Sequence, residues 1–339
     1  MATIAFPSLS KCHTLSTSHT YTYVHHPASQ SHPTLLFLHG FPSSCFDWRH
    51  QIHFFANKGY GILAPDLLGY GGTSKPTSLD AYRSRPMASE IIELMDHEGI
   101  ARVHAVAHDT GCNLLSRLAD YFPGRLLSCT FLDVPYSNPG ERFDLQMVNS
   151  LTREFMGFER FGYLEFFVQS DAGRVLDESR PRIDICIPNQ GDSFFTLFYP
   201  ADPDLWITDL GPIGALKSWL LNDRRGPLPT YISEKEKTTH QTIMKGQYSH
   251  ALKWYQALVG NINEEDEIRA GLRPVLPMPV LMVSPQPSRL QFPGTMEKMN
   301  QVAGDLTMKT VSTKGHWVQL EAGDEVNAFL TEFWEQANA

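Results

Sequence analysis

The stretch that decides the fold runs from residue 103 to residue 115 and reads VHAVAHDTGCNLL. Its first half is a run of Val and Ala typical of a buried strand, and its second half has the apolar spacing of a helix. Between the two, Asp109 is flanked at a distance of two residues by Ala107 and Gly111. The pattern small-x-nucleophile-x-small predicts a nucleophile elbow, a strained turn at which a Cβ on Gly111 would clash.

The residue at the centre of this turn is a carboxylate and not a hydroxyl. Asp is ionised at neutral pH, and it suits displacement at a saturated carbon, which leaves an alkyl ester on the enzyme. Hydrolysis of that ester requires a histidine base and donors for the oxyanion that forms on the Asp109 carboxyl. The structural alternative is a strand-end Asp that only caps the next helix. The motif alone leaves both open.

Composition excludes several classes of protein. The net charge of −9 and the lack of a basic block argue against nucleic acid or an anionic membrane as partner. No apolar run approaches ~18 residues, which argues against a spanning helix. The N-terminus lacks the apolar core of a signal peptide, and the five cysteines have no paired spacing, so we expect a cytoplasmic protein. Without a glycine-rich nucleotide loop or a metal-ligand spacing, we expect no cofactor and no metal.

Strand-like and helix-like segments alternate through the first 135 residues and again after residue 279. The stretch between them is aromatic and helical, without that rhythm. We therefore predict an α/β fold with a mostly parallel, helix-covered sheet and a helical cap inserted after the sixth strand. The expected domains are a core at 1–139 and 273–339 and a cap at 140–272. Beside an edge hairpin near 14–24, expected strands include 34–39, 61–65, 126–134, 279–284 and 306–311, and expected helices 51–57, 87–97 and 325–337.

Two further motifs follow core strands and converge on the elbow. His39-Gly40-Phe41-Pro42 ends an early strand, where the backbone N–H of Phe41 would pair with that of Thr110 in an oxyanion hole. An ordinary Gly/Pro turn is the alternative. His316 lies in the segment TKGHW after the last strand, and its place after the nucleophile in chain order fits the expected base.

The acid that orients the base is the member that the sequence leaves open. The loop after residue 284 has no carboxylate before Glu297, so Asp133, at the end of the strand after the elbow helix, becomes the candidate. Its alternative role is to cap or fix a loop.

Two tyrosines in the insert, Tyr163 and Tyr255, are candidate acids for an alkoxide leaving group, because a phenol of pKa ~10 can give up a proton. Packing is the alternative for each. For Trp48, Cys112 and Asp66 we expect packing or loop-fixing roles.

Several blocks in order together resemble one family. HGFP, FDWRHQI, PDLLGYGGTSKP, HDTG, LKWYQ, GHW and EAGDEVN are similar to blocks of the α/β-hydrolase fold epoxide hydrolases, particularly the soluble fungal type, over about residues 34–334. The resemblance implies Asp109 as nucleophile and His316 as base. It also implies oxyanion donors at Phe41 and Thr110 and cap tyrosines at Tyr255 and Tyr163.

The sequence departs from that family at two places. The family usually has Trp-Gly after the nucleophile, where this chain has Thr110 and Gly111, and it commonly places the acid after the seventh strand, where this chain has Pro287. The related haloalkane and haloacetate dehalogenases draw the acid from the strand after the elbow helix, which supports Asp133 but also points towards dehalogenation.

The competing functions separate on the leaving group. A halide needs no acid, whereas Tyr163 and Tyr255 favour an epoxide, and Thr110 supplies no indole N–H for a halide. We therefore expect a hydrolase that opens a bulky apolar epoxide to a diol with water, in detoxification or secondary metabolism, as a monomer or homodimer. A dehalogenase, or a catalytically altered relative that binds or cyclises a natural-product intermediate, is the alternative.

Overall fold

The structure, a computed structural model, describes residues 1–29, 32–178, 193–291 and 294–337. The chain divides into two compact units. Unit 1 comprises Met1–Glu141, Ile262–Gln286 and Phe292–Ala339, and unit 2 comprises Arg142–Asn261 and Pro287–Gln291. The main segment of unit 2 follows the sixth strand of the sheet, as the sequence predicted.

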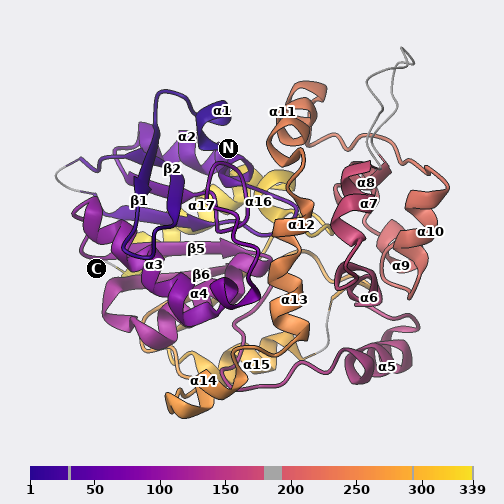
Figure 1. The fold of residues 1–339 in the computed structure, drawn as a ribbon. Helices are drawn as coiled ribbons and strands as arrows, with labels where there is room; N and C mark the ends of the chain where they lie inside the picture. The colour runs from indigo at the N-terminus through magenta and orange to yellow at the C-terminus, as the bar shows by residue number, and fades with distance from the viewer. Residues whose placement is uncertain (30–31, 179–192, 292–293, 338–339) are drawn as a thin grey trace. The chain divides into compact units, whose positions relative to one another are not determined.

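Unit 1 is built on an eight-stranded sheet in the order β1-β2-β4-β3-β5-β6-β7-β8. Figure 1 labels four of these strands, β1, β2, β5 and β6. Strands β3 to β8 are parallel, and β1 and β2 form an antiparallel hairpin at one edge. The predicted strands after the hairpin are all present, with ends that shift by at most two residues. The strands are β1 Ser10–Thr14, β2 Thr20–His26, β3 Thr34–Leu38, β4 Gly61–Pro65, β5 Val103–His108, β6 Leu126–Leu132, β7 Val280–Ser284 and β8 Leu306–Thr310.

The register of the central strands determines which loops meet. Strand β5 pairs with β3 on one side and with β6 on the other, with Ala107 opposite Leu38 and His108 opposite Leu132. All six residues of β5 are buried. Because carboxyl ends of parallel strands lie at the same edge of a sheet, the loops that follow β3, β5 and β6 emerge side by side.

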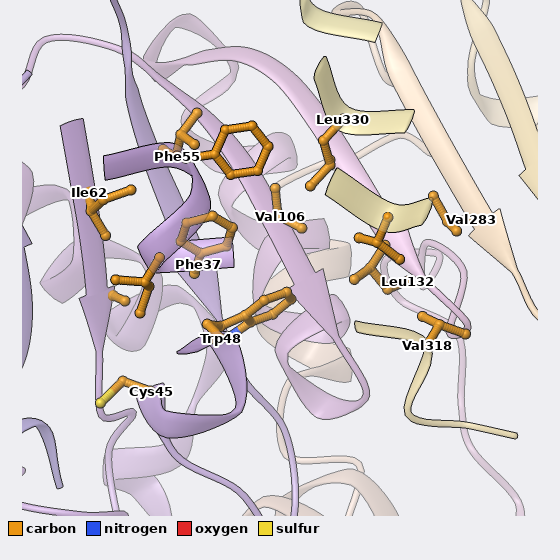
Figure 2. Packing of buried hydrophobic residues seen from close by; sticks show 14 of the residues in the cluster. Phe37, Cys45, Trp48, Phe55, Ile62, Val106, Leu132, Val283, Val318 and Leu330 are labelled. Atoms are coloured by element: carbon orange, nitrogen blue, oxygen red, sulfur yellow. The ribbon is translucent and has the colours of Figure 1, made fainter. Parts of the chain in front are cut away.

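Helices cover the sheet of unit 1, and Figure 2 shows the packing on one side. Alternate strand residues such as Phe37 and Val106 point to this side, as the period of two requires. They pack against Trp48, Phe55 and Leu330, among other buried side chains. The helices of unit 1 are α1 Ala2–Ala5, α2 Arg49–Asn57, α3 Ser84–His97, α4 Thr110–Tyr121, α14 Glu264–Arg269, α15 Thr295–Val302, α16 Val318–Glu321 and α17 Gly323–Ala337, with 3-10 turns at Cys45–Trp48, Leu79–Tyr82 and Pro123–Arg125.

Among the described residues of unit 2, the regular elements are all helices, joined by loops. Aromatic rings form much of its interior, and Phe167, Phe194 and Phe198 are at most 5% exposed. The short segment Pro287–Gln291 joins this unit through Arg160, whose Nε–H donates to the carbonyl of Leu290 at 3.2 Å. The helices are α5 Leu145–Met156, α6 Tyr163–Phe167, α7 Ala172–Glu178, α8 Ser193–Phe198, α9 Leu205–Asp209, α10 Ala215–Leu221, α11 Glu234–Met244, α12 Tyr248–Ala251 and α13 Lys253–Val259.

Three further features concern only the described part of the chain. None of its helices has the length and apolar character needed to cross a membrane. Cys12, Cys45, Cys112 and Cys129 are free thiols, while Cys186 lies outside the described residues. No group of three or more His, Cys, Asp or Glu side chains in these ranges is arranged to hold a metal ion.

Candidate active site

Asp109 lies in the turn between β5 and α4, at the position of the predicted elbow. Its backbone has φ 53° and ψ −129°, a conformation that costs a non-glycine residue about 1–3 kcal/mol. Two glycines make room for this turn. A Cβ on Gly111 would overlap the carbonyls of Leu38 and His39, and a Cβ on Gly40 would overlap the Asp109 carboxylate. The close approach of strand, helix and loop therefore depends on both glycines.

The backbone N–H of Phe41 donates to Asp109 Oδ1 at 2.8 Å. One expected oxyanion donor therefore already contacts the carboxylate. Thr110, the other expected donor, is the first residue of α4, and the first N–H groups of a helix have no partner within it. Phe41 therefore occupies Oδ1, while Oδ2 lies on the side of His316.

His316 lies between β8 and α16, and its ring lies between the carboxylates of Asp109 and Asp133. Its Nδ1 is 2.5 Å from Asp133 Oδ2, within the distance that a hydrogen bond requires. Its Nε2 is 3.6 Å from Asp109 Oδ2. Asp133 directly follows β6 and has a positive φ of 61°, unusual for a residue other than glycine. The structure therefore brings together Asp109, His316 and Asp133, the three residues that the sequence suggested as a triad.

Electrostatics at this site favours a charged pair in the resting protein. Burial raises the pKa of Asp109, but the nearby imidazolium of His316 outweighs burial and lowers that pKa to about 2. Burial lowers the pKa of His316, but its interactions with the carboxylates of Asp109 and Asp133 outweigh burial and raise that pKa to about 9. Near neutral pH the site therefore holds an imidazolium between two carboxylates.

His108 is a site residue to which the sequence reasoning assigned no role. Its Nε2 is 2.9 Å from the backbone carbonyl oxygen of His316, and the two imidazole centroids are 4.3 Å apart. Burial lowers the pKa of His108 to about 3, so the ring is neutral and Nε2–H donates to the carbonyl. The only sign of this residue in the sequence is its position directly before Asp109, the expected nucleophile. His108 holds the backbone of the expected base from the strand that carries Asp109.

The loop that carries Phe41 is held by His39, which is also neutral because burial lowers its pKa to about 4. His39 Nε2 accepts the N–H of Leu67 at 2.9 Å, so Nδ1–H donates to the carbonyl of Gly40, also at 2.9 Å. The neighbouring Asp66 is fully buried and accepts backbone N–H groups of Cys45 and Gly72. These contacts fit the loop-fixing role expected for Asp66.

The two tyrosines expected as acids lie next to each other in unit 2. Tyr163 begins α6 and Tyr255 belongs to α13, and their ring centroids are 6.3 Å apart with the planes nearly perpendicular. Phe167 contacts both rings, with centroid distances of 5.2 Å to Tyr163 and 5.1 Å to Tyr255. The fold of unit 2 therefore pairs two phenols that are far apart in the sequence.

Comparison with known proteins identifies the family of the chain. The family model of the alpha/beta hydrolase fold matches residues 33–323, and the chain belongs to that family. Among its relatives, epoxide hydrolase A of Mycobacterium tuberculosis is 27% identical over 307 residues, which cover 89% of this chain and 90% of the relative. Bifunctional epoxide hydrolase 2 of Mus musculus is 25% identical over 95% of this chain, but the match spans only 56% of that longer protein.

Solved structures show the same likeness. The crystal structure of epoxide hydrolase A from Mycobacterium thermoresistibile matches with a TM-score of 0.73 and 25% identity, covering 96% of this chain and 98% of that one. An epoxide hydrolase from an endophytic Streptomyces reaches a TM-score of 0.77 at 23% identity, over 96% and 95% of the two chains, and supports the fold alone. The chain is thus similar to epoxide hydrolases of the α/β-hydrolase fold, and the narrower likeness to the fungal type stays a prediction.

The charged pair predicts the titration of His316. In the free protein we expect its pKa near 9, and we expect Asp109→Asn or Asp133→Asn to lower it, because each removes a carboxylate that stabilises the imidazolium. Since the folded pKa lies above the ordinary value of 6.5, this proton contributes stability that is fully present below pH ~6.5 and is lost as the pH rises through about 9. NMR of the ring protons measures this directly, with His108 as the histidine that stays neutral. Titration of His316 at or below 6.5 would contradict the charged pair.

Proposed function

We propose that this protein is an epoxide hydrolase that opens an epoxide to a vicinal diol through an ester on Asp109. The observation that carries the proposal is the arrangement of His316 between two carboxylates, one of them at a nucleophile elbow. A hydrolase that used only general acid and base would not need a carboxylate in this strained turn. The aromatic interior of unit 2 supports a bulky apolar substrate.

In the first step, Asp109 Oδ2 attacks a ring carbon of the epoxide and a carbon–oxygen bond of the ring breaks. The epoxide oxygen leaves as an alkoxide, which takes a proton from the phenol of Tyr163 or Tyr255. The alkoxide is a strong base, so its departure is favoured by a proton donor in a way that departure of a halide is not. The product is a hydroxyalkyl ester on Asp109.

In the second step, His316 takes a proton from water, and the resulting hydroxide attacks Cγ of Asp109. The charge that develops on Oδ1 is stabilised by the N–H of Phe41, which already lies 2.8 Å from that oxygen, and by the N–H of Thr110. Asp133 orients the ring and stabilises the imidazolium as it forms. Collapse of the intermediate breaks the bond to the diol oxygen, which takes the proton from the His316 imidazolium and leaves as the diol. The carboxyl of Asp109 keeps one water oxygen and returns its own proton to His316, which restores the resting site.

Formation of the ester itself prepares the base. Esterification removes the negative charge of Asp109, which contributes to the raised pKa of His316. The pKa of His316 therefore falls when the ester forms, and the imidazolium gives up its proton, which replaces the one that the phenol lost in the first step. The neutral imidazole is then able to accept a proton from water. The charged pair of the resting site and the neutral base of the second step are two states of the same three residues.

A dehalogenase is the second candidate, favoured by one observation. The carboxylate on His316 comes from Asp133, after β6, which is where dehalogenase relatives carry their acid. The paired tyrosines and the Thr at position 110 argue against it. Release of halide from haloalkanes or haloacetate, without diol formation from any epoxide, would favour this candidate. A binding or cyclisation protein without hydrolytic activity was the third possibility, because the loop after β7 has no carboxylate to orient His316. The contact of Asp133 with His316 removes that argument.

The nucleophile is tested by a single turnover in 18O-water against a panel of epoxides. We expect label in the Asp109 carboxyl, because the water attacks Cγ of the ester. Asp109→Ala should abolish turnover, while Asp80→Asn, a change at an exposed carboxylate, should leave turnover unchanged. Label that enters the diol directly, or more than trace activity in folded Asp109→Ala, would exclude the aspartyl ester.

The base and its acid are tested by separating the two steps in rapid mixing. Asp133→Asn should slow ester hydrolysis far more than ester formation, because only hydrolysis requires the oriented, neutral imidazole. His316→Gln should do the same more completely, so the ester accumulates and is detected by mass spectrometry. Equal slowing of both steps in Asp133→Asn would remove Asp133 from the role of triad acid.

The phenols are tested by single and double replacement with Phe. Either single variant should slow ester formation in part, and Tyr163→Phe with Tyr255→Phe should slow it by roughly 10²–10⁴-fold, the usual contribution of a general acid. Tyr231→Phe, which removes another phenol of unit 2, is the matched control. Ester formation at the parent rate in the double variant would mean that both tyrosines only pack.

A further inference from the structure

A third carboxylate lies against the loop of the catalytic base, and the proposed mechanism does not use it. Glu321 ends α16, five residues after His316. Its Oε1 accepts the backbone N–H of Trp317 at 3.0 Å. On the other side of the base, a Cβ on Gly315 would overlap both carboxylate oxygens of Glu321, so the carboxylate lies directly against the backbone of Gly315. One side chain therefore contacts both neighbours of His316.

We propose that Glu321 is a positioning residue for His316. Its carboxylate holds the backbone of the base on both sides, and its negative charge favours the imidazolium that forms during ester hydrolysis. This inference rests on the proposed function only in naming that step. The same contacts predict a property of the free protein, the affinity of His316 for its proton, which requires no substrate.

Glu321 differs from the other charged groups around His316 in the part of the residue that it contacts. Asp109 and Asp133 face the two ring nitrogens, and neutral His108 faces the ring and the carbonyl. Glu321 bonds neither ring nitrogen and contacts the backbone instead. The pKa of Glu321 is raised, because burial and the nearby charge of Asp133 outweigh the N–H groups of Trp317 and Gly315 and the charge of His316, which lower it. The mutual influence of Glu321 and His316 is therefore electrostatic as well as geometric.

Retention of this carboxylate has a cost that a merely structural contact would avoid. Burial of a charged group is unfavourable, and a backbone N–H can be satisfied equally well by a neutral acceptor. If the loop needed only one acceptor, Gln would serve at position 321, but the N–H groups of both Trp317 and Gly315 lie against the two carboxylate oxygens. A negative charge at this place instead stabilises the imidazolium, whose Asp109 partner is neutral while the ester is present.

The test compares Glu321→Gln with Glu325→Gln. The first keeps the size of the side chain and one acceptor oxygen but removes the charge. The second removes a carboxylate that bonds the N–H of Ser312 in the same loop, four residues before the base, and is the matched control. We expect Glu321→Gln to slow ester hydrolysis by roughly 10–100-fold, the range seen when a partner that orients a metal-ligating histidine is removed. Ester formation should change by no more than about 2-fold, since Asp109 attacks without the base.

The titration of His316 in the free protein supplies the independent readout. Glu321→Gln should lower the pKa of His316, and Glu325→Gln should leave it at the parent value. If the parent protein forms no ester with any epoxide, the proposed function fails, but this titration still decides the role of Glu321. An unchanged His316 pKa in folded Glu321→Gln, or an equal shift in the control, would overturn the inference.

A second variant covers the case in which Glu321→Gln does not fold. Glu321→Asp keeps the charge but withdraws the carboxylate from the backbone by one methylene group. It should slow ester hydrolysis through lost positioning, while the pKa of His316 stays closer to the parent value than in any neutral variant. Ester hydrolysis at the parent rate in Glu321→Asp would show that the contact with the loop backbone has no role in the reaction.

Discussion

The site depends on the left-handed backbone conformation of Asp109, held where β5 ends and α4 begins. That conformation is unfavourable for a residue with a Cβ, and the surrounding structure sustains it. Gly111 lets the helix approach the carbonyls at the end of β3, and Gly40 leaves space for the carboxylate itself. In this conformation the carboxylate accepts the N–H of Phe41 on one oxygen and faces His316 with the other. The division of labour between the two oxygens therefore follows from a backbone constraint.

The charge on Asp109 controls the affinity of His316 for its proton. Asp109 and His316 stabilise each other's charged forms, which opposes the effect of burial on the pKa of each, and the Asp133 carboxylate contacts the other ring nitrogen of His316. Esterification of Asp109 would withdraw one of the two negative charges without moving any side chain. His108, whose pKa burial keeps low, adds a hydrogen bond to the loop without a competing charge. Because His108 is neutral, it does not repel the imidazolium of His316.

The position of the acid also bears on the segment after β7. With Asp133 on His316, no carboxylate is needed in that loop, and Pro287–Gln291 belongs to the helical unit 2 through the contact of Arg160 with Leu290. Asp133 reaches the base because β6 is the neighbour of β5 and ends at the same edge of the sheet. Its positive φ shows that the chain turns sharply at this residue. The carboxylate that contacts His316 thus follows β6, the strand beside β5, and not β7.

The sequence by itself determined the features that local chemistry encodes. The run VHAVAH followed by Asp109 and Gly111 predicted the elbow, because a strained turn needs small neighbours, and the alternation of apolar segments predicted the mostly parallel sheet and the helical insert. Only the tertiary structure decided which carboxylate contacts His316, since that hydrogen bond joins residues 183 positions apart. It also revealed that His108 and Glu321 contact backbone groups of His316 and of its neighbour Trp317. Sequence patterns specify the conformation of a segment, whereas the choice of partner depends on strand order and register, which no single segment contains.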